Sequence, residues 1–509
     1  MITFTIALIV LVLGYVFYGK FIEKFFGIDP GREVPSKSLS DGVDYIALPT
    51  WKAYMIQFLN IAGLGPIFGA IMGAKFGTSS YLWIVFGTIF AGSVHDYLSG
   101  MLSVRNGGES LPQLIGRYLG TTIQKVFLVF SLILLILVGA VFVSQPADIL
   151  SRLTPDSMGL NTWVGIIFVY YLLATLFPID KIIGKLYPIF GAALLFMAFG
   201  IMIALFVHRP ELPEMWNGFG VKYDKNPLFP MMFISIACGA ISGFHATQSP
   251  LMARCIQNES NGRIVFYGAM ISEGIVALIW AAAATSYFGE HGTDSTAAQI
   301  VLDISKTWLG KVGGFLAILG VVVAPISTGD TALRSARLIV ADFFKKKQKT
   351  IGSRLSISVP LFVITFLALF YSLRDNEGFN IIWRYFAWSN QTLAMFTLWA
   401  VTVYLESKRK NVLVTLIPAL FMSMVTCTYI LLAKEGLQLP WYIAYSGGAL
   451  FTITLLVIFL VWRNKQRKGC KSIKLQSPLC KMWIFVLPLQ SAYVCARTRY
   501  FYGTVFQDT

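Results

Sequence analysis

Apolar segments long enough to cross a lipid bilayer recur along almost the whole chain. A spanning helix needs about 20 predominantly apolar residues. The 509 residues are 56% hydrophobic and 13% charged, whereas a soluble domain carries about 25% charged residues. We therefore predict an all-α polytopic membrane protein with about thirteen transmembrane helices. These helices are expected over residues 2–19, 54–74, 81–103, 126–150, 160–178, 185–207, 228–249, 265–289, 311–328, 355–373, 380–404, 412–433 and 442–462.

Lysine and arginine concentrate in alternate loops between these segments. The odd-numbered loops, counted from the first helix, hold most of the basic residues, and the even-numbered loops hold few. Basic loops remain on the cytoplasmic side. The chain is therefore predicted to lie in the cytoplasmic (inner) membrane, with its N-terminus outside and its C-terminus inside. Because the loops account for the net charge of +16, we expect the lipid bilayer and no nucleic acid as partner.

The ninth loop is the most basic of all. The run 331–344 precedes Lys345, Lys346, Lys347 and Lys349. An amphipathic helix that ends in a basic cluster binds anionic lipid headgroups. We expect such an interfacial helix over this run.

Two segments carry residues that interrupt helices. In segment 54–74, Gly63 and Gly65 flank Pro66, which cannot donate a helical hydrogen bond. Segment 228–249 contains Gly239, Gly243, His245 and Gln248 and is followed by Pro250. A broken helix at membrane depth is tolerated only where protein or a water-filled cavity covers it. The alternative is that the glycines are packing surfaces, and we favour that interpretation for Gly69 and Gly73.

The two interrupted segments lie five helices apart, which predicts an internal repeat. Paired interruptions in corresponding halves indicate the binding site of a transporter. We expect an N-terminal helix and cytoplasmic loop in 1–53 and five-helix repeats of opposite orientation in 54–207 and 228–404. Two accessory helices are expected in 412–462, and a basic cytoplasmic tail of unknown role in 463–509.

Ionisable residues inside predicted spans are candidate functional groups, because burying them is costly. Asp96 follows His95 in the third segment and could carry a proton or a cation, or pair with Arg105. His245 lies beside the second interruption. Glu273 in the eighth segment needs a proton or a partner, so a titrating role and a fixed ion pair remain open.

The ninth segment ends in a run of oxygen-bearing side chains. Ser327, Thr328 and Asp330 could form a sodium site with carbonyls freed in segment 54–74, although Asp330 could instead pair with Arg334 at a helix end. In the eleventh segment, Asn390 and Gln391 are expected to hydrogen-bond between helices.

No motif of a soluble enzyme or of an ATP-driven pump is present. The sequence lacks a G-x-x-x-x-G-K-[ST] loop, an H-E-x-x-H helix and a G-x-S-x-G turn. The four histidines are widely spaced and show no metal-ligand pattern. We therefore predict no catalysis, no metal site beyond the possible sodium and no cofactor other than a coupling ion.

Several long strings resemble those of one known family. They are DGVDY (41–45), AGLGPIFGA (62–70), AGSVHDY (91–97), RNGGES (105–110), ACGAISGFHATQSP (237–250), YGAMISEGIVALIWA (267–281), APISTGDTALRSAR (324–337) and FAWSNQTLA (386–394). The chain resembles the shorter variety of the carbon starvation protein A (CstA) family from about residue 1 to 460. The resemblance implies the leucine-transporter-like inverted repeat of the amino acid–polyamine–organocation superfamily. It also implies peptide uptake under carbon starvation or proton-coupled pyruvate uptake.

The combined expectation is an ion-coupled symporter for a small solute that bears a carboxylate. The N-termini of half-helices favour a carboxylate. We predict that the coupling ion uses Asp96, Glu273 or the group of Ser327, Thr328 and Asp330. The alternative is a membrane nutrient sensor that binds solute without moving it. The sequence leaves open the solute, the coupling ion and the oligomeric state. The solute is predicted to bind at Gly63, Gly65, Ser242, His245 and Gln248.

Overall fold

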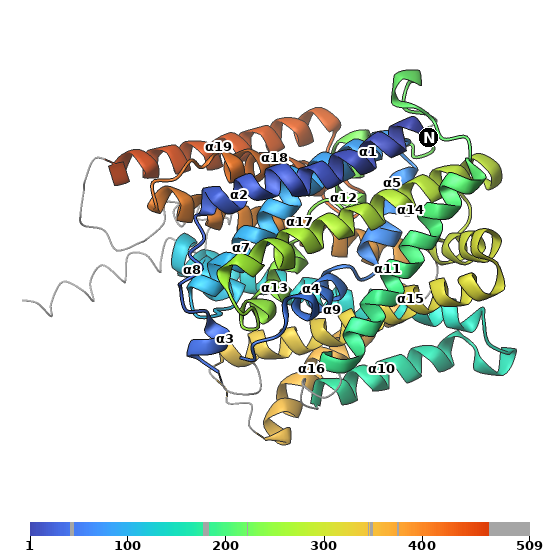
Figure 1. The fold of residues 1–509 in the computed structure, drawn as a ribbon, viewed down its shortest axis with the longest axis horizontal. Coiled ribbons are helices and arrows are strands. Elements are labelled where there is room, and N and C mark those ends of the chain that lie inside the picture. The colour runs from blue at the N-terminus through green and yellow to red at the C-terminus, as the bar shows by residue number, and fades with distance from the viewer. Residues whose placement is uncertain are drawn as a thin grey trace, which may run out of the picture.

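A computed structural model describes residues 1–40, 45–176, 183–220, 222–344, 346, 350–373 and 376–467. Every regular element among these residues is helical (Figure 1). The first half contains α1 (Ile2–Leu13), η1 (Gly14–Tyr18), α2 (Gly19–Phe26), α3 (Pro35–Ser38), α4 (Thr50–Ile61), η2 (Gly65–Gly69), α5 (Ala70–Ala74), α6 (Ser79–Leu82), η3 (Trp83–Gly92), α7 (Ser93–Arg105), α8 (Leu111–Leu119), α9 (Thr121–Ser151), η4 (Asp156–Met158), α10 (Leu160–Leu176) and α11 (Ile183–His208). The second half contains η5 (Met215–Asn217), α12 (Leu228–Ser235), α13 (Gly243–Ala253), η6 (Glu259–Asn261), η7 (Arg263–Gly268), α14 (Ala269–His291), α15 (Ala297–Phe343), α16 (Ile351–Ser372), α17 (Asn376–Ser407), α18 (Leu413–Leu432) and α19 (Trp441–Arg467).

Each of the thirteen segments predicted to span the membrane contains helical structure in its described residues. In the described part of the chain, seven helices are long and apolar enough to cross a bilayer, and an eighth span results if the bent pair Thr50–Ile61 and Gly65–Ala74 is counted as one. Apolar side chains are exposed on the outside of the bundle, among them Phe17, Phe370 and Leu450. Such a surface is stable in lipid. The chain is therefore a multi-pass membrane protein.

The helices pack into one bundle, and their buried apolar residues form a large cluster and a smaller one between α9, α10, α15 and α16. α9 packs lengthwise against α15 and also contacts α10, α16 and α17. Figure 1 shows α18 and α19 along one edge of the bundle and α10 and α16 along the opposite edge. α9 contains Pro146 in its interior and remains helical on both sides of it. The carbonyl of Phe142, which Pro146 cannot bond, accepts a hydrogen bond from the hydroxyl of Tyr171 at 2.9 Å.

The loops alternate between two ends of the bundle. At the end that carries α3 and α8 (Figure 1), Arg105 of the third loop pairs with Glu259 of the seventh at 3.0 Å. At the end that carries the N-terminus, Lys75 of the second loop donates to the carbonyl of Thr293 in the eighth at 3.4 Å. Each of these two contacts joins loops that the charge pattern places on the same side of the membrane.

The ninth predicted segment and the interfacial helix after it need correction. α15 begins at Ala297, bends at Gly310, where φ is +64°, and continues to Phe343 without a second break. Arg334 and Arg337 within it are buried, and Arg334 Nη2 donates to the carbonyl of Ala174 at 2.6 Å. The predicted surface helix over 331–344 is therefore wrong, because the run is buried in the bundle and a protein carbonyl binds Arg334 in place of lipid headgroups and water.

Two further differences concern the ends of the chain. The first helical stretch does not end near residue 19 but continues through α2 to Phe26. At the other end, α19 extends the last predicted span to Arg467, where Arg463 and Arg467 pair with Glu406 at 3.0 and 2.7 Å. The predicted tail beyond residue 467, the string at 41–44 and Lys345, Lys347 and Lys349 lie outside the described residues.

Candidate functional site

The first predicted break lies between Ile61 and Gly65. α4 ends at Ile61, η2 begins at Gly65, and the helices on either side differ in direction by 54°. Among the described residues, none accepts a hydrogen bond from the backbone N–H of Gly63 or Leu64, although both residues are buried. Buried N–H groups almost always have a partner. The break is confirmed, and it presents two donors that suit an anionic ligand.

The second predicted break is also confirmed. α12 ends at Ser235, and α13 begins at Gly243 after seven residues without helical structure. Asn390 of α17 caps the new helix, because its Oδ1 accepts from the backbone N–H of Phe244 at 2.7 Å and from the hydroxyl of Ser242 at 3.1 Å. Ser242 therefore lies at the N-terminus of the second half-helix.

Neighbouring side chains satisfy the carbonyls that this break exposes. Gln391 Nε2 donates to the carbonyl of Phe233 at 3.0 Å, and Thr88 of η3 donates to the carbonyl of Gly239 at 3.0 Å. The expected interhelical hydrogen bonds of Asn390 and Gln391 are thus confirmed. Their partners are backbone N–H and carbonyl groups at the ends of the two half-helices. At membrane depth such groups need hydrogen-bond partners within the protein.

The two breaks pack directly against each other. A Cβ atom added at Gly65 would lie 2.1 Å from Cys238 Cβ, and one at Gly73 would lie 2.3 Å from the side chain of Ile236. A Cβ at Gly69 would lie 3.1 Å from a carbonyl oxygen of α12. The packing interpretation of Gly69 and Gly73 is confirmed, and Gly65 serves the same close contact beside its role in the break.

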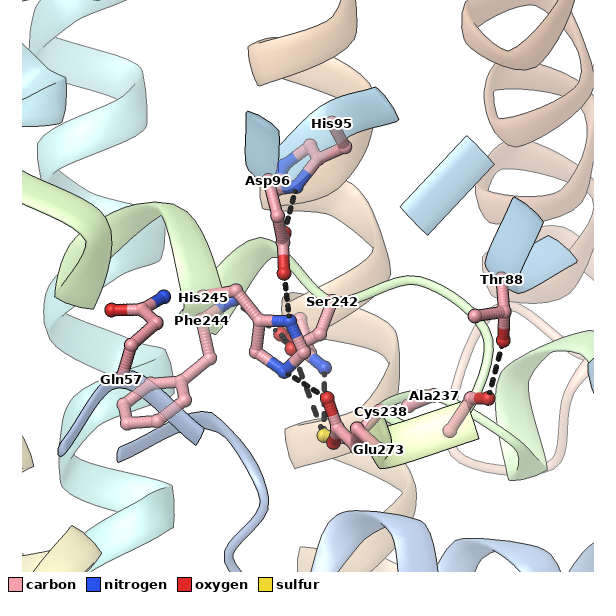
Figure 2. Close-up of polar contacts among 12 residues, drawn as sticks. Gln57, Thr88, His95, Asp96, Ala237, Cys238, Ser242, Phe244, His245 and Glu273 are labelled. Atoms are coloured by element: carbon pink, nitrogen blue, oxygen red, sulfur yellow. Dashed lines mark hydrogen bonds and ion pairs between the residues drawn. The ribbon is translucent and has the colours of Figure 1, made fainter. Parts of the chain in front are cut away.

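Three of the predicted site residues form one buried chain of contacts (Figure 2). Asp96 Oδ1 lies 2.7 Å from His95 Nδ1, and Asp96 Oδ2 lies 2.8 Å from His245 Nδ1. The other nitrogen of that ring, His245 Nε2, lies 3.2 Å from Glu273 Oε2. All four side chains are fully buried. The chain joins α7, α13 and α14 at the first turn after the second break.

This arrangement excludes one of the alternatives for Asp96. Arg105 binds Glu259 and not Asp96, so the suggested Asp96–Arg105 pair is wrong. A histidine whose ring nitrogens each face a carboxylate can hold a proton on either nitrogen, or on both as an imidazolium. The arrangement therefore sets His245 between two carboxylates, hydrogen-bonded to Asp96 and in ion-pair contact with Glu273.

Ser327 and Thr328 lie at the first break and away from the histidine chain. Thr328 Oγ1 donates to the carbonyl of Ala324 at 3.0 Å and lies 3.3 Å from the carbonyl oxygen of Leu59, the third-last residue of α4. A Cβ at Gly63 would lie 3.2 Å from the same hydroxyl. Ser327 also donates to Ala324, at 2.7 Å. The Thr328 hydroxyl keeps acceptor capacity, so a cation could share it with backbone oxygens of the break.

Asp330 lies one turn from its partner within α15. Its Oδ1 is 3.8 Å from Arg334 Nη2, and both side chains are almost fully buried. The pairing suggested for these two residues is present, although it lies in the middle of a helix and not at a helix end.

Gln248 belongs to a set of buried amides beside the breaks. Its Nε2 donates to Thr247 at 3.0 Å, and Gln57 of α4 approaches Ser249 at 3.4 Å. In the described part of the chain, the side-chain oxygens of Gln248, Gln57 and Asn60 have no hydrogen-bond partner. Buried oxygens of this kind indicate a place for water or a polar solute.

Comparison with known families identifies the family of the chain. The model of the family "Carbon starvation protein CstA" matches residues 1–159, 157–307 and 292–429. The chain belongs to the CstA family. It is shorter than typical members.

Named relatives of this CstA-family chain include transporters. The "Peptide transporter CstA" of Bacillus subtilis is 26% identical over 563 residues, covering 89% of this chain and 94% of the relative. The "Pyruvate/proton symporter BtsT" of Escherichia coli is 25% identical over 341 residues, covering 54% and 48%. An "Uncharacterized membrane protein" of Haemophilus influenzae is 43% identical over 340 residues, covering 57% and 91%.

Sequence reasoning missed two contributors to the site of this CstA-family chain. Thr88 was not singled out, although a hydroxyl inside the apolar run 83–92 needs a carbonyl partner. His95 was noted only as the neighbour of Asp96. Its Nδ1 contact with Asp96 is local and could have been anticipated from their adjacency in a predicted span.

Proposed function

We propose that this chain is a secondary active transporter that takes up a small carboxylate-bearing solute together with an ion. The observation that carries the proposal is the meeting of two broken helices beside a buried carboxylate–imidazole–carboxylate chain. Broken helices supply unpaired backbone groups for a solute at membrane depth. Buried titratable chains supply a path for a coupled proton.

The proposed architecture is the five-plus-five inverted repeat, with repeats over 54–207 and 228–404. The helix in 1–53 and the pair in 412–462 lie outside the repeats, and the N-terminus faces away from the cytoplasm. The positions of the two breaks, five helical segments apart, support the repeat. The contact between two odd loops supports their lying on one side of the membrane, and their basic residues support the cytoplasmic side. On this proposal, thirteen helices cross the membrane.

The proposed solute site lies between the breaks. The free N–H groups at Gly63 and Leu64 and the N-terminus of α13 at Ser242 favour a negative group. Gly65, His245 and Gln248 complete the surroundings. A peptide and pyruvate each carry a carboxylate, and the relatives named above suggest both as candidates for this chain.

The coupling route supported best is a proton that moves through Asp96, His245 and Glu273. Each contact in this route is 3.2 Å or shorter. The group of Ser327, Thr328 and Asp330 is the candidate for sodium, because hard cations take oxygen ligands.

Uptake into proteoliposomes tests the proposal. Purified protein would be supplied with labelled pyruvate or L-alanyl-L-alanine while a proton gradient and a sodium gradient are imposed separately. We expect accumulation under the proton gradient. Binding of either solute without accumulation under any gradient would contradict transport and favour a sensor.

A further inference from the structure

A polar cavity lies apart from the histidine chain, at the end of the bundle that carries the N-terminus. It is partly enclosed and has a volume of about 150 Å³. A single water needs about 15 Å³, so the cavity admits a small organic molecule. Its walls come from α5, α12, α17, α18 and the loops at 222–227 and 433–440.

The floor of this cavity reaches both broken helices. Met72 belongs to α5, the half-helix after the first break, and Ser235 is the last residue of α12, directly before the second break. Ala387 lines the cavity one turn before Asn390, the residue that caps α13. A molecule in the cavity therefore lies on the outer side of the proposed solute site.

The rim of the cavity carries charges of both signs. Arg384 and Lys434 contribute two cations, and Asp224 and Glu435 contribute two carboxylates. The hydroxyl of Tyr429 donates to Glu435 Oε1. The carboxylate of Glu435 is thus held in place and is only 5% exposed.

Arg384 is poorly satisfied for a guanidinium. Its Nη1 lies 3.5 Å from Glu435 Oε2, and this is its one ion pair to a residue that the structure describes. Charge-assisted N–H···O bonds are about 2.7–2.9 Å long, and a guanidinium has five N–H donors. Arg384 therefore has donors to spare for a planar two-oxygen group such as a carboxylate.

We infer that this cavity is an outer binding subsite selective for a zwitterion, such as an amino acid or a short peptide. The carboxylate of the solute takes the free donors of Arg384, and its ammonium group faces Glu435 and Asp224. A mono-anion such as pyruvate would add an unbalanced negative charge to a cavity whose two cations and two carboxylates already balance. The inference deepens the proposed function, because the bound zwitterion is the solute passed to the breaks.

Calorimetric titration of the purified full-length protein tests the subsite. The probes are L-alanyl-L-alanine, its N-acetyl derivative, its C-terminal amide and pyruvate. We expect the unblocked dipeptide to bind at least tenfold more tightly than each of the others, since a hydrogen bond to a charged group is worth about 1.5–3 kcal/mol. Arg384→Gln should weaken dipeptide binding at least tenfold, and Arg384→Lys should weaken it less.

The matched control is Arg152→Gln. Arg152 also forms an exposed ion pair, with Asp148 at 3.0 Å, but does not line the cavity, and its substitution should leave dipeptide binding unchanged. A thermal unfolding scan of each variant excludes misfolding as the cause. Dipeptide binding by Arg384→Gln at wild-type strength, or equal binding of pyruvate and dipeptide, would overturn the subsite.

The binding and uptake experiments distinguish failure of the subsite from failure of the proposed transport. If wild-type vesicles accumulate solute but Arg384→Gln binds dipeptide normally, the subsite is wrong and transport stands. If Arg384-dependent binding is measured but wild-type vesicles accumulate nothing, the subsite stands and transport is wrong.

Discussion

His245 lies between two carboxylates in a place that solvent does not reach. An isolated charge there would be strongly disfavoured, and removing one partner of a buried ion pair costs about 3–5 kcal/mol. The three side chains therefore form one unit, and the number of protons that the unit holds decides its charge. A transporter can couple solute movement to the binding and release of a proton by this unit.

Glu273→Gln should separate solute movement from proton movement. A proton crossing 100 mV supplies about 2.3 kcal/mol, which sustains about a 50-fold solute accumulation. We expect the variant to lose that accumulation and to retain exchange of labelled for unlabelled solute in counterflow. The control is Glu290→Gln at the exposed end of the same helix. Full accumulation by Glu273→Gln would contradict the proton route.

Gly65 tests the contact between the two breaks. An added methyl group would overlap Cys238 Cβ, and overpacking a core costs about 1–3 kcal/mol. Gly65→Ala should therefore lower the thermal unfolding midpoint, and Cys238→Gly in the same chain should restore much of the loss. Gly165→Ala, where nothing lies within 4 Å, should have little effect. A double variant no more stable than Gly65→Ala alone would mean that the breaks do not touch.

At the scale of elements, half-helices are stable here because side chains from other helices replace their lost hydrogen bonds. Asn390 caps α13, and Gln391 and Thr88 bind the carbonyls left open around the break. A helix end without such partners would be costly in lipid. The stability of the broken helix therefore depends on hydrogen bonds from α17 and η3.

The N-terminus of α1 is also capped by a side chain from another part of the chain. Glu214 accepts hydrogen bonds from the backbone N–H groups of Ile2 and Thr3 at 2.9 and 2.7 Å and from the Met1 ammonium at 2.6 Å. Burial alone would raise the pKa of Glu214, but hydrogen bonds from the Met1 ammonium and from Thr3 outweigh it and lower that pKa to about 2. The ionised form is therefore bound more tightly in the folded protein.

This pKa predicts a pH dependence of stability. The folded pKa lies below the ordinary value of 4.5, so the contribution is complete above pH 4.5 and is lost as pH falls toward 2. In thermal unfolding scans, the wild type should lose more stability over this range than Glu214→Gln. Glu211→Gln, which removes an exposed carboxylate from the same loop, should follow the wild type. Parallel curves for wild type and Glu214→Gln would show that this cap is not formed.

At the scale of the whole molecule, the membrane divides the loops into two sets. On the proposed orientation, Lys37 lies in a cytoplasmic loop and Lys225 in an external one, and both are exposed. In a chain with its six cysteines replaced by alanine, an impermeant maleimide should label Lys225→Cys on intact cells and Lys37→Cys only after lysis. The reverse pattern would invert the proposed topology.

The positions of the basic residues predicted the sides of the loops, but they wrongly predicted an interfacial helix over 331–344. Basic residues spaced along a helix are compatible with a bilayer surface and also with a buried helix whose arginines find carbonyl partners. Arg334 is of the buried kind, because its Nη2 donates to the carbonyl of Ala174 in α10 at 2.6 Å. Nothing in the run itself distinguishes the two situations.

The sequence alone determined most of the membrane helices and the two breaks, although it missed the bend of α15 at Gly310. In lipid a backbone must bond to itself, so apolar length predicts the helices, and glycine and proline predict the interruptions. The tertiary structure alone decided which polar groups meet. His245 and Asp96 are 149 residues apart, and Arg384 and Glu435 approach each other from α17 and the loop after α18. Contacts of this kind depend on how helices pack, which is the sum of many weak side-chain contacts that no short motif records.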